Sequence, residues 1–422
     1  MRDLKSERSG QLTESVYDGS AIRAFAPRNL PPAPPLVLSP EDEGAIARAN
    51  QAIGRLEGIR SALPEARLFT YFYVRKEAVL SAQIEGTQSS LSDLLRFESG
   101  IIPGVPLNEV EEVSDYIAAM EVGLLAMTHG KPIDVELIRN VHWTLGTKSG
   151  RGAHLTPGQL RVEQNWVGGA SPYDAEYVPP PADLVPGLVE SLLRFVNESK
   201  MPTLVKAALA HAQFETIHPF FDGNGRLGRL LVTLILQAEQ VILEPLLYLS
   251  LYFKQHRNAY YESLQRVRFE GDWEQWLGFF IRGVTDVSVQ AVDTATRLLA
   301  LVETDRGRIR AELKTSASSA LRVLDALAKR PVTTAKRVAE ESGVTLPTAL
   351  STLAAFQKNG MVSELTGLKK NRVFAYSRYL DVLNRGTELG TSTDGVPSAA
   401  GATASHLPTI ASATTPGNRK KS

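Results

Sequence analysis

The chain has 422 residues and carries 46 basic and 46 acidic side chains, which gives a formal net charge of zero. This length allows two or three domains with cores of their own, and the balanced charge excludes a general polyanion binder while leaving a local basic patch open. The sequence contains no cysteine, which excludes disulfides, thiolate metal sites and cysteine nucleophiles.

The first 300 residues divide into an arm and a helical region. We predict residues 1–40 to be an arm whose proline-rich end, residues 26–40, lies extended along a surface. Apolar residues recur at spacings of three and four through residues 41–300, which predicts a helical bundle. The most apolar stretch, residues 230–253, is interrupted by polar residues and a proline, so we expect buried helices there. With no signal peptide and no membrane segment, we expect a cytoplasmic protein.

Residues 164–181 are the exception within the helical region. Two short β-prone runs, residues 165–167 and 176–178, flank a loop of glycine, serine, proline and aspartate, which predicts a hairpin. The exposed edge of such a hairpin can pair with an extended segment of a target chain. The alternative is a hairpin that only closes the bundle.

A smaller domain is expected at residues 301–385. It begins with a connecting helix and continues as a winged helix-turn-helix, with helices at residues 334–342 and 345–359 and a wing after them. Residues 386–422, rich in glycine, serine, threonine, alanine and proline, are expected to be a disordered tail.

The charge of the winged helix leaves its partner open. Residues 331–385 hold eight basic and four acidic side chains, but the recognition helix carries only Lys358. Lys369, Lys370 and Arg372 make the wing more basic. DNA affinity depends on phosphate neutralisation, so DNA binding and protein docking are both compatible with this pattern.

The stretch HPFFDGNGRLGR, residues 218–229, indicates an anion site. Pro219 disfavours continuing the preceding helix, and Gly223-Asn224-Gly225 opens the next one. A helix N-terminus offers unpaired N–H groups, and glycines let a ligand approach the backbone. Arg226 and Arg229 can add charge-assisted contacts to phosphate oxygens.

Two further side chains complete a chemical hypothesis. Asp222 is a hard carboxylate beside the expected phosphate cradle, where Mg²⁺ is commonly held. His218 can act as a general base near neutral pH. Each residue alone has an ordinary structural explanation, as a helix cap, a turn or a solvated arginine. Together they indicate phosphoryl or nucleotidyl transfer to a hydroxyl.

This stretch resembles the Fic family motif, HPFx(D/E)GN(G)RxxR, at every defining position. The similarity extends over roughly residues 30–300, through RKEAVLSAQIEGTQSSL, TPGQLRVEQNWVGG and YVPPP. It implies a mainly α protein: a Fic-type helical bundle with a β-hairpin flap, here followed by the winged helix. The implied activity is transfer of AMP from ATP, with Mg²⁺, onto a Ser, Thr or Tyr hydroxyl of a protein, which includes the enzyme itself.

The resemblance also assigns roles to residues. His218 would be the base and Asp222 the Mg²⁺ ligand. The nucleotide would be bound by Gly223, Asn224, Gly225, Arg226, Leu227, Gly228 and Arg229. A phosphate-transferring branch resembling the Doc toxins has lysine in place of Gly225, so glycine favours AMP transfer. UMP transfer and removal of AMP remain open.

Less specific positions are also carried over. Val167 and Gly168 would dock the target on the flap, and Tyr261 and Gln213 would contact the nucleotide, with Asn258 as a weaker choice. A tyrosine on an apolar helix is more often a core residue.

A helix near residues 70–86 ends in Ser81-x-x-x-Glu85-Gly86, which resembles the family's inhibitory motif, (S/T)xxxE(G/N). The alternative is an ordinary Ser/Glu pair before a helix-ending glycine. The main functional alternative is a DNA-binding regulator whose Fic domain only senses nucleotide. A homodimer is compatible with the sequence, which does not fix the oligomeric state.

Overall fold

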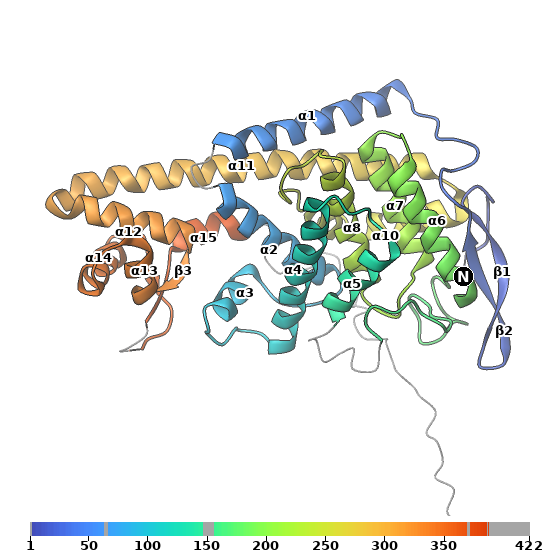
Figure 1. Ribbon diagram of the computed structural model, residues 1–422, viewed down its shortest axis with the longest axis horizontal. Coiled ribbons are helices and arrows are strands. Elements are labelled where there is room, and N and C mark those ends of the chain that lie inside the picture. The colour runs from blue at the N-terminus through green and yellow to red at the C-terminus, as the bar shows by residue number, and fades with distance from the viewer. Residues whose placement is uncertain (1, 63–65, 147–155, 369–371, 386, 388–422) are drawn as a thin grey trace, which may run out of the picture.

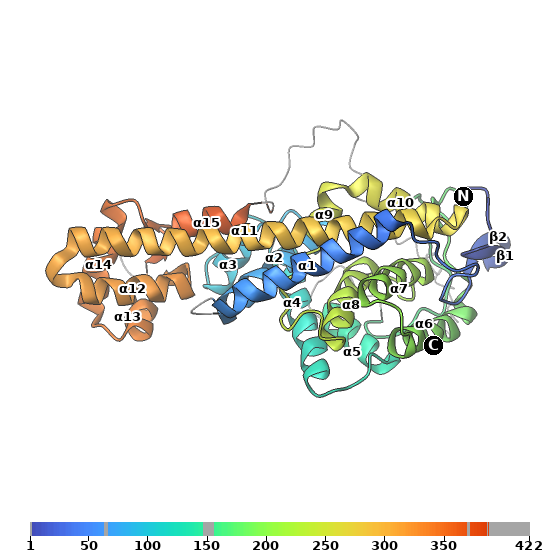
Figure 2. The same cartoon turned by 90° about the horizontal axis from the view of Figure 1, so that it is seen from above.

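The computed structural model describes residues 2–62, 66–146, 156–368, 372–385 and 387. It is mainly helical, which confirms the predicted fold class, and its two parts are joined by one very long helix, α11 (Trp273–Leu313). In Figures 1 and 2, α1 (Pro40–Ala62) runs beside α11 along one side of the molecule. Among the described residues, no helix is both long and apolar enough to cross a membrane.

The larger part is a bundle around one buried helix. Helix α7 (Thr203–Ile217) is buried at every position from Leu204 to Ile217, as expected for a helix surrounded by other helices. The Trp276 indole on α11 donates to the Ala208 carbonyl of α7 at 2.8 Å, which fixes the long helix on this core. The other helices of this part are α2 (Ala66–Ile84), α3 (Leu91–Glu98), α4 (Leu107–Thr128), α5 (Val135–Gly146), α6 (Val185–Glu198), α8 (Asn224–Ala238), α9 (Ser250–Gln255) and α10 (Arg257–Glu270).

A hairpin near the N-terminus was not predicted. Strands β1 (Gly10–Tyr17) and β2 (Ser20–Pro27) pair antiparallel, within the arm expected at residues 1–40. Asp18 and Gly19 both have positive φ, 47° and 74°, as a two-residue hairpin turn requires. The Phe25 N–H donates to the Val178 carbonyl at 2.9 Å, so β2 lies beside the segment expected to form the flap.

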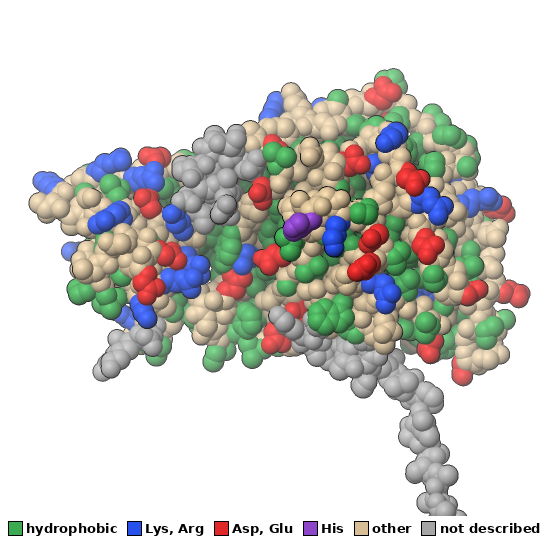
Figure 3. Space-filling model, viewed as in Figure 1, with side chains coloured by type: hydrophobic (Ala, Val, Ile, Leu, Met, Phe, Trp, Pro, Cys, Tyr) green, Lys and Arg blue, Asp and Glu red, His purple; other side chains and the backbone are tan. Residues whose placement is uncertain are grey.

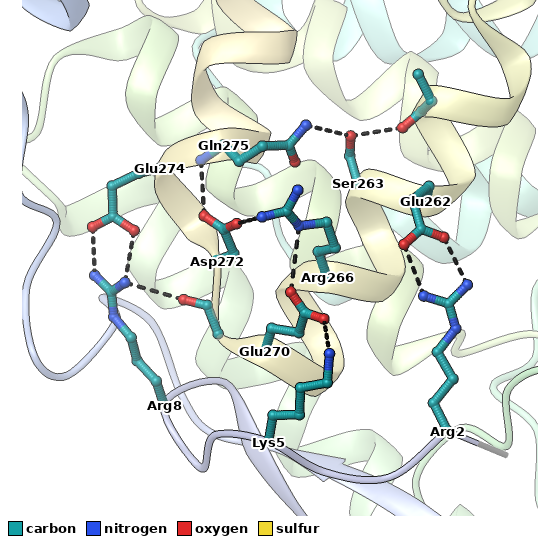
Figure 4. Close-up of polar contacts among 12 residues, drawn as sticks. Arg2, Lys5, Arg8, Glu262, Ser263, Arg266, Glu270, Asp272, Glu274 and Gln275 are labelled. Carbon is teal, nitrogen blue, oxygen red and sulfur yellow. Dashed lines mark hydrogen bonds and ion pairs between the residues drawn. The ribbon is translucent and has the colours of Figure 1, made fainter.

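Charged side chains fasten the first residues onto α10 and α11, as Figure 4 shows. The ion pairs are Arg2–Glu262, Lys5–Glu270 and Arg8–Glu274. Arg8 is the most buried of the three cations, with 14% of its side chain exposed. It also donates to the carbonyls of Pro34 and Pro35 at 3.0 and 2.9 Å, which holds the proline-rich segment against the bundle.

The smaller part has the predicted winged-helix arrangement. Its elements are α12 (Ala317–Lys329), β3 (Val332–Thr334), α13 (Ala335–Ser342), α14 (Leu346–Lys358), β4 (Ser363–Glu364), β5 (Val373–Ala375) and α15 (Ser377–Asn384). The strands form an antiparallel sheet in the order β3-β5-β4. Gly343 closes α13 with φ of 63°, the left-handed value that favours glycine. Lys369 and Lys370 of the predicted wing, and the predicted tail apart from Thr387, lie outside the described residues.

The chain after α15 returns to the larger part and contacts α2. Lys76 Nζ donates to the Arg385 carbonyl at 2.6 Å, and Gln83 Nε2 donates to the Thr387 carbonyl at 3.1 Å. The side chain of Asn384 donates to the Ser92 hydroxyl on α3 at 3.0 Å. The last described residues therefore lie against the helix that ends just before Glu85.

Candidate nucleotide-binding site

The motif forms a tight loop between α7 and α8. His218 ends α7 in the left-handed region, with φ of 49°, and Gly223 precedes α8 with φ of 75°. The Asn224 side chain closes the loop: its Oδ1 accepts the Phe220 N–H at 2.9 Å and its Nδ2 donates to the Phe220 carbonyl at 2.8 Å. Asn224 was expected to bind the nucleotide, and its side-chain amide shapes the loop itself.

The start of α8 can receive an anion. The first backbone bond of the helix runs from the Leu227 N–H to the Gly223 carbonyl at 3.0 Å. The preceding N–H groups, of Asn224, Gly225 and Arg226, lie before that bond, and none has a partner among the described residues. Unpaired N–H groups and the helix dipole favour a negative ligand at this position.

His218 is held neutral. Burial, with added repulsion from Arg161 and Arg268, lowers the pKa of His218 to about 3. Its Nδ1 is buried and has no hydrogen-bond partner among the described residues. A neutral imidazole with an available ring nitrogen is the state in which a histidine can accept a proton.

Asp222 presents a carboxylate suited to a hard cation. Its Oδ1 accepts the Gly223 N–H at 2.7 Å, while Oδ2 lies 3.7 Å from Arg226 Nη2, and the side chain is 57% exposed. The described residues contain no group of three or more His, Cys, Asp or Glu placed to hold a metal. A cation here would therefore need oxygens from a bound molecule, which is how Mg²⁺ is held with phosphates.

The two arginines of the motif differ in their partners. Arg226 Nη1 is buried without a partner among the described residues. Arg229 is bound by α2: its Nε donates to Ser81 Oγ, and its Nη2 donates to the Ser81 carbonyl, both at 2.9 Å. Its Nη2 also lies 2.7 Å from Glu85 Oε1. Burial alone would lower the pKa of Arg229, but Glu85, together with Tyr260 and Glu215, outweighs this effect and the pKa is raised.

Glu85 lies over the first turn of α8. It follows the end of α2, and Gly86 reverses the chain there with φ of 104°, which favours glycine. A Cβ placed on Gly225 would be 2.2 Å from Glu85 Oε1 and 3.0 Å from Arg229 Nη1. The inhibitory motif and the anion site therefore meet at Gly225, where a side chain would not fit.

The other site residues predicted from the sequence are Tyr261, Gln213, Val167 and Gly168. Tyr261 lies on α10 close enough to Glu85 and Arg229 for their charges to act on its pKa, and 38% of the residue is exposed. Gln213 does not face the loop: it is buried and its Nε2 donates to the Arg28 carbonyl at 2.8 Å. Val167 pairs with Tyr177 through one antiparallel bridge, so the flap has a single bridge in place of two strands. Gly168 follows with φ of 71°.

Two residues that the sequence did not single out hold the loop in place. His142 on α5 stacks on Phe220, with ring centroids 3.7 Å apart. Its Nδ1 accepts the Gly158 N–H at 2.8 Å, so its Nε2 carries the proton and donates to the Asp222 carbonyl at 2.9 Å. Arg161 donates to the His218 carbonyl. Arg161 belongs to the stretch TPGQLRVEQNWVGG, but nothing in the spacing indicates a contact 57 residues away.

Comparison with known families identifies these parts. Residues 44–125 match the family model described as Fic/DOC family N-terminal, and residues 132–236 match Fic/DOC family. Residues 316–373 match the IclR helix-turn-helix domain. The chain therefore carries a Fic N-terminal domain and a Fic domain, and the third match is consistent with the winged helix. This confirms the resemblance found in the motif.

Similar proteins agree. The chain is 42% identical over 65 residues to a probable protein adenylyltransferase of Aquifex aeolicus, covering 15% of this chain and 20% of that protein. It is 34% identical over 159 residues to protein adenylyltransferase fic-1 of Caenorhabditis briggsae, covering 36% and 30%. To protein adenylyltransferase Fic of Drosophila yakuba it is 30% identical over 255 residues, covering 57% and 45%. The chain thus spans less than half the length of these relatives.

A solved structure supports the fold. The crystal structure of a Fic family protein from Desulfovibrio desulfuricans G20 has a TM-score of 0.54 and 21% sequence identity. The match covers 81% of this chain and 97% of that one. At this identity the likeness shows the fold alone.

Proposed function

We propose that this protein is an adenylyltransferase, which moves AMP from ATP to a Ser, Thr or Tyr hydroxyl of a protein, its own chain included. The observation that carries the proposal is that one short loop places a neutral His218 at its start and the unpaired N–H groups of α8 at its end. The names of the similar proteins add support, since they are called protein adenylyltransferases.

The chemistry follows from these groups. His218 takes the proton of the target hydroxyl, and that oxygen attacks the α-phosphorus of ATP. A new P–O bond forms, the bond to the β-phosphate breaks, and pyrophosphate leaves. The N–H groups of Gly225 and its neighbours, with Arg226, bind the phosphate oxygens, where oriented donors stabilise the charge that develops.

Mg²⁺ fits this site through Asp222, whose exposed Oδ2 can complete a donor set with phosphate oxygens. When bound there, the ion neutralises phosphate charge and favours departure of pyrophosphate. His142 keeps Asp222 in position by donating to its backbone carbonyl.

We propose that Glu85 restrains the reaction. Arg229 is the cation expected to bind the terminal phosphate of ATP, and here it is held by Glu85 and Ser81. While that pairing persists, ATP can bind only with its terminal phosphate displaced, which turns the α-phosphorus away from the attacking oxygen. A small misplacement of this kind can cost about 10²-fold in rate.

The test is transfer of label from α-labelled ATP to protein, with Mg²⁺. His218→Ala in the Glu85→Gly background should lose transfer by roughly 10²–10⁴-fold while ATP still binds, because only the base is removed. Transfer within tenfold of the parent would contradict the role of His218. Label from γ-labelled ATP would indicate phosphorylation, and label from α-labelled UTP would indicate UMP transfer.

For the winged helix we propose duplex DNA as the partner, supported by the match to a helix-turn-helix family. Its electrostatic footprint is modest: Lys336 and Arg337 on α13 pair with Glu340 and Glu341. Figure 3 shows acidic side chains among the basic ones at this end of the molecule. A gel shift at low salt that weakens on Arg372→Ala would support DNA binding. No shift on any duplex would favour protein docking.

A further inference from the structure

Arg161 has a set of partners that is unusual for a buried cation. The residue is only 1% exposed, and its side chain donates to three backbone carbonyls. Nε donates to His218 at 3.0 Å, Nη1 to Glu163 at 3.0 Å, and Nη2 to Pro180 at 2.5 Å. Its own N–H donates to the Pro219 carbonyl at 2.9 Å. Among the described residues, no carboxylate forms an ion pair with it.

Such a placement is costly, which indicates a specific need for it. Burying a guanidinium without a counter-ion costs several kcal/mol unless its donors are all satisfied. Burial lowers the pKa of Arg161 to about 10, although the group remains charged at neutral pH. A neutral side chain would fill the same space at lower cost. Only the rigid fork of an arginine can reach three carbonyls in three directions at once.

The three carbonyls belong to segments that must act together. Glu163 and Pro180 lie at the two ends of the flap, whose only bridge joins Val167 to Tyr177 among the described residues. His218 is the proposed base. Its left-handed backbone is strained for a residue other than glycine and persists only where neighbours hold it.

We propose that Arg161 is a positioning residue for AMP transfer, which ties both ends of the flap to the backbone of His218. The Arg161 side chain would then fix the position of a target segment, paired with the flap, relative to His218. This inference rests on the proposed function, but its structural part can be tested without any catalysis.

The charge of Arg161 has a second effect. The charged groups that act on His218 are Arg161 and Arg268, which lower its pKa, and Asp222, which raises it. Removing the charge at position 161 should therefore raise the pKa of His218, while a lysine should keep it low. A residue that only fills space would change neither the histidine nor the flap.

The first experiment compares Arg161→Gln and Arg161→Lys with Arg139→Lys as a matched control. Arg139 also donates to a backbone carbonyl, that of Gly158, at 2.7 Å, but contacts neither the flap nor His218. We expect amide exchange at Val167 and Tyr177 to quicken at least about tenfold in Arg161→Gln, less in Arg161→Lys, and not in the control. Unchanged exchange in both Arg161 variants, with the fold intact by circular dichroism, would overturn the proposal.

The second experiment measures self-modification with α-labelled ATP against pH, in the Glu85→Gly background. Arg161→Lys should lower the rate by about 10²-fold and leave the acid limb where it is. Arg161→Gln should lower the rate and also move the acid limb to higher pH. ATP affinity should be unchanged in both, since Arg161 does not touch α8. Equal rates with Arg161 present or replaced would contradict positioning. If Glu85→Gly alone gives no label, the proposed function fails, and amide exchange still decides the role of Arg161.

Discussion

Glu85 lies at the end of α2 and binds Arg229 on α8, with Oε1 and Nη2 2.7 Å apart. Arg229 is 98% buried by side chain while Glu85 is 40% exposed, so the carboxylate is the partner that can leave. Ser81 holds the same guanidinium from the previous turn of α2. The cation of the anion site is thus bound to α2 through two of its residues.

Replacing Glu85 by glycine should activate the protein. We expect self-modification with labelled ATP to rise at least about tenfold, because Arg229 becomes available to phosphate. Stability without nucleotide should fall by about 1 kcal/mol, a value kept small because the pair is partly exposed. Glu198→Gly, which removes an exposed carboxylate at the end of α6, is the control. Equal labelling of the Glu85 variant and the parent would rule out restraint by this helix.

Asp222→Asn should separate metal binding from loop structure. Asparagine keeps the oxygen that accepts the Gly223 N–H, but loses the charge that Mg²⁺ needs. The Mg²⁺ concentration for half-maximal transfer should rise at least about tenfold, roughly as expected for a lost metal ligand. The melting temperature should gain less from Mg²⁺ added with ATP than in the parent. Asp183→Asn, at an exposed site outside the loop, should respond as the parent does.

The free energy of unfolding should depend on pH through two buried groups, Glu77 and His211, whose pKa values are shifted in opposite directions. Burial raises the pKa of Glu77 to about 7, so its contribution is fully present below about pH 4.5 and is lost as the pH rises towards 7. Burial lowers the pKa of His211 to about 3, so its contribution is present above about pH 6.5 and is lost as the pH falls towards 3. The two slopes oppose each other between about pH 4.5 and 6.5.

Glu77→Gln tests this balance. The variant should gain on the parent by about 2–3 kcal/mol in unfolding free energy between pH 5 and pH 8, because only the parent loses its protonated carboxyl. Urea unfolding at both pH values measures the difference. A constant offset between the two proteins would show that Glu77 does not titrate in this range.

Arg8→Ala should destabilise the protein more than Arg2→Ala. Arg8 is largely buried and donates to both oxygens of Glu274 as well as to backbone carbonyls, so its loss should cost about 1.5–3 kcal/mol. The Arg2–Glu262 pair is half exposed and should contribute less than about 1 kcal/mol. Thermal unfolding of the two variants provides the comparison, and equal losses would contradict this ranking.

Sequence patterns predicted those features that depend on neighbouring residues, such as the ends of helices. The two helices of the winged domain lie within a residue or two of their expected bounds, because caps such as Thr345 and Gly343 mark them. The motif's loop and helix were also predicted. The N-terminal hairpin was not predicted, although Asp18-Gly19 is a turn signal.

Contacts between distant parts of the chain could not be predicted from the sequence. The bond from Arg161 to the His218 carbonyl and the stack of His142 on Phe220 depend on how distant segments pack, and no periodicity encodes them. Gln213 stands one turn before the motif, yet its side chain serves the N-terminal arm. The sequence predicted the helix on which Gln213 lies, but not the residue that its side chain contacts.

The contacts of α2 with the segment after α15 have a practical consequence. A shortened protein that stops after the Fic domain would keep the whole motif but lose the Arg385 and Thr387 carbonyls to which Lys76 and Gln83 donate. Gln83 stands two residues before Glu85. A basal rate measured on such a fragment would therefore describe an α2 that has lost these two contacts, and assays of this protein should use the chain through at least residue 387.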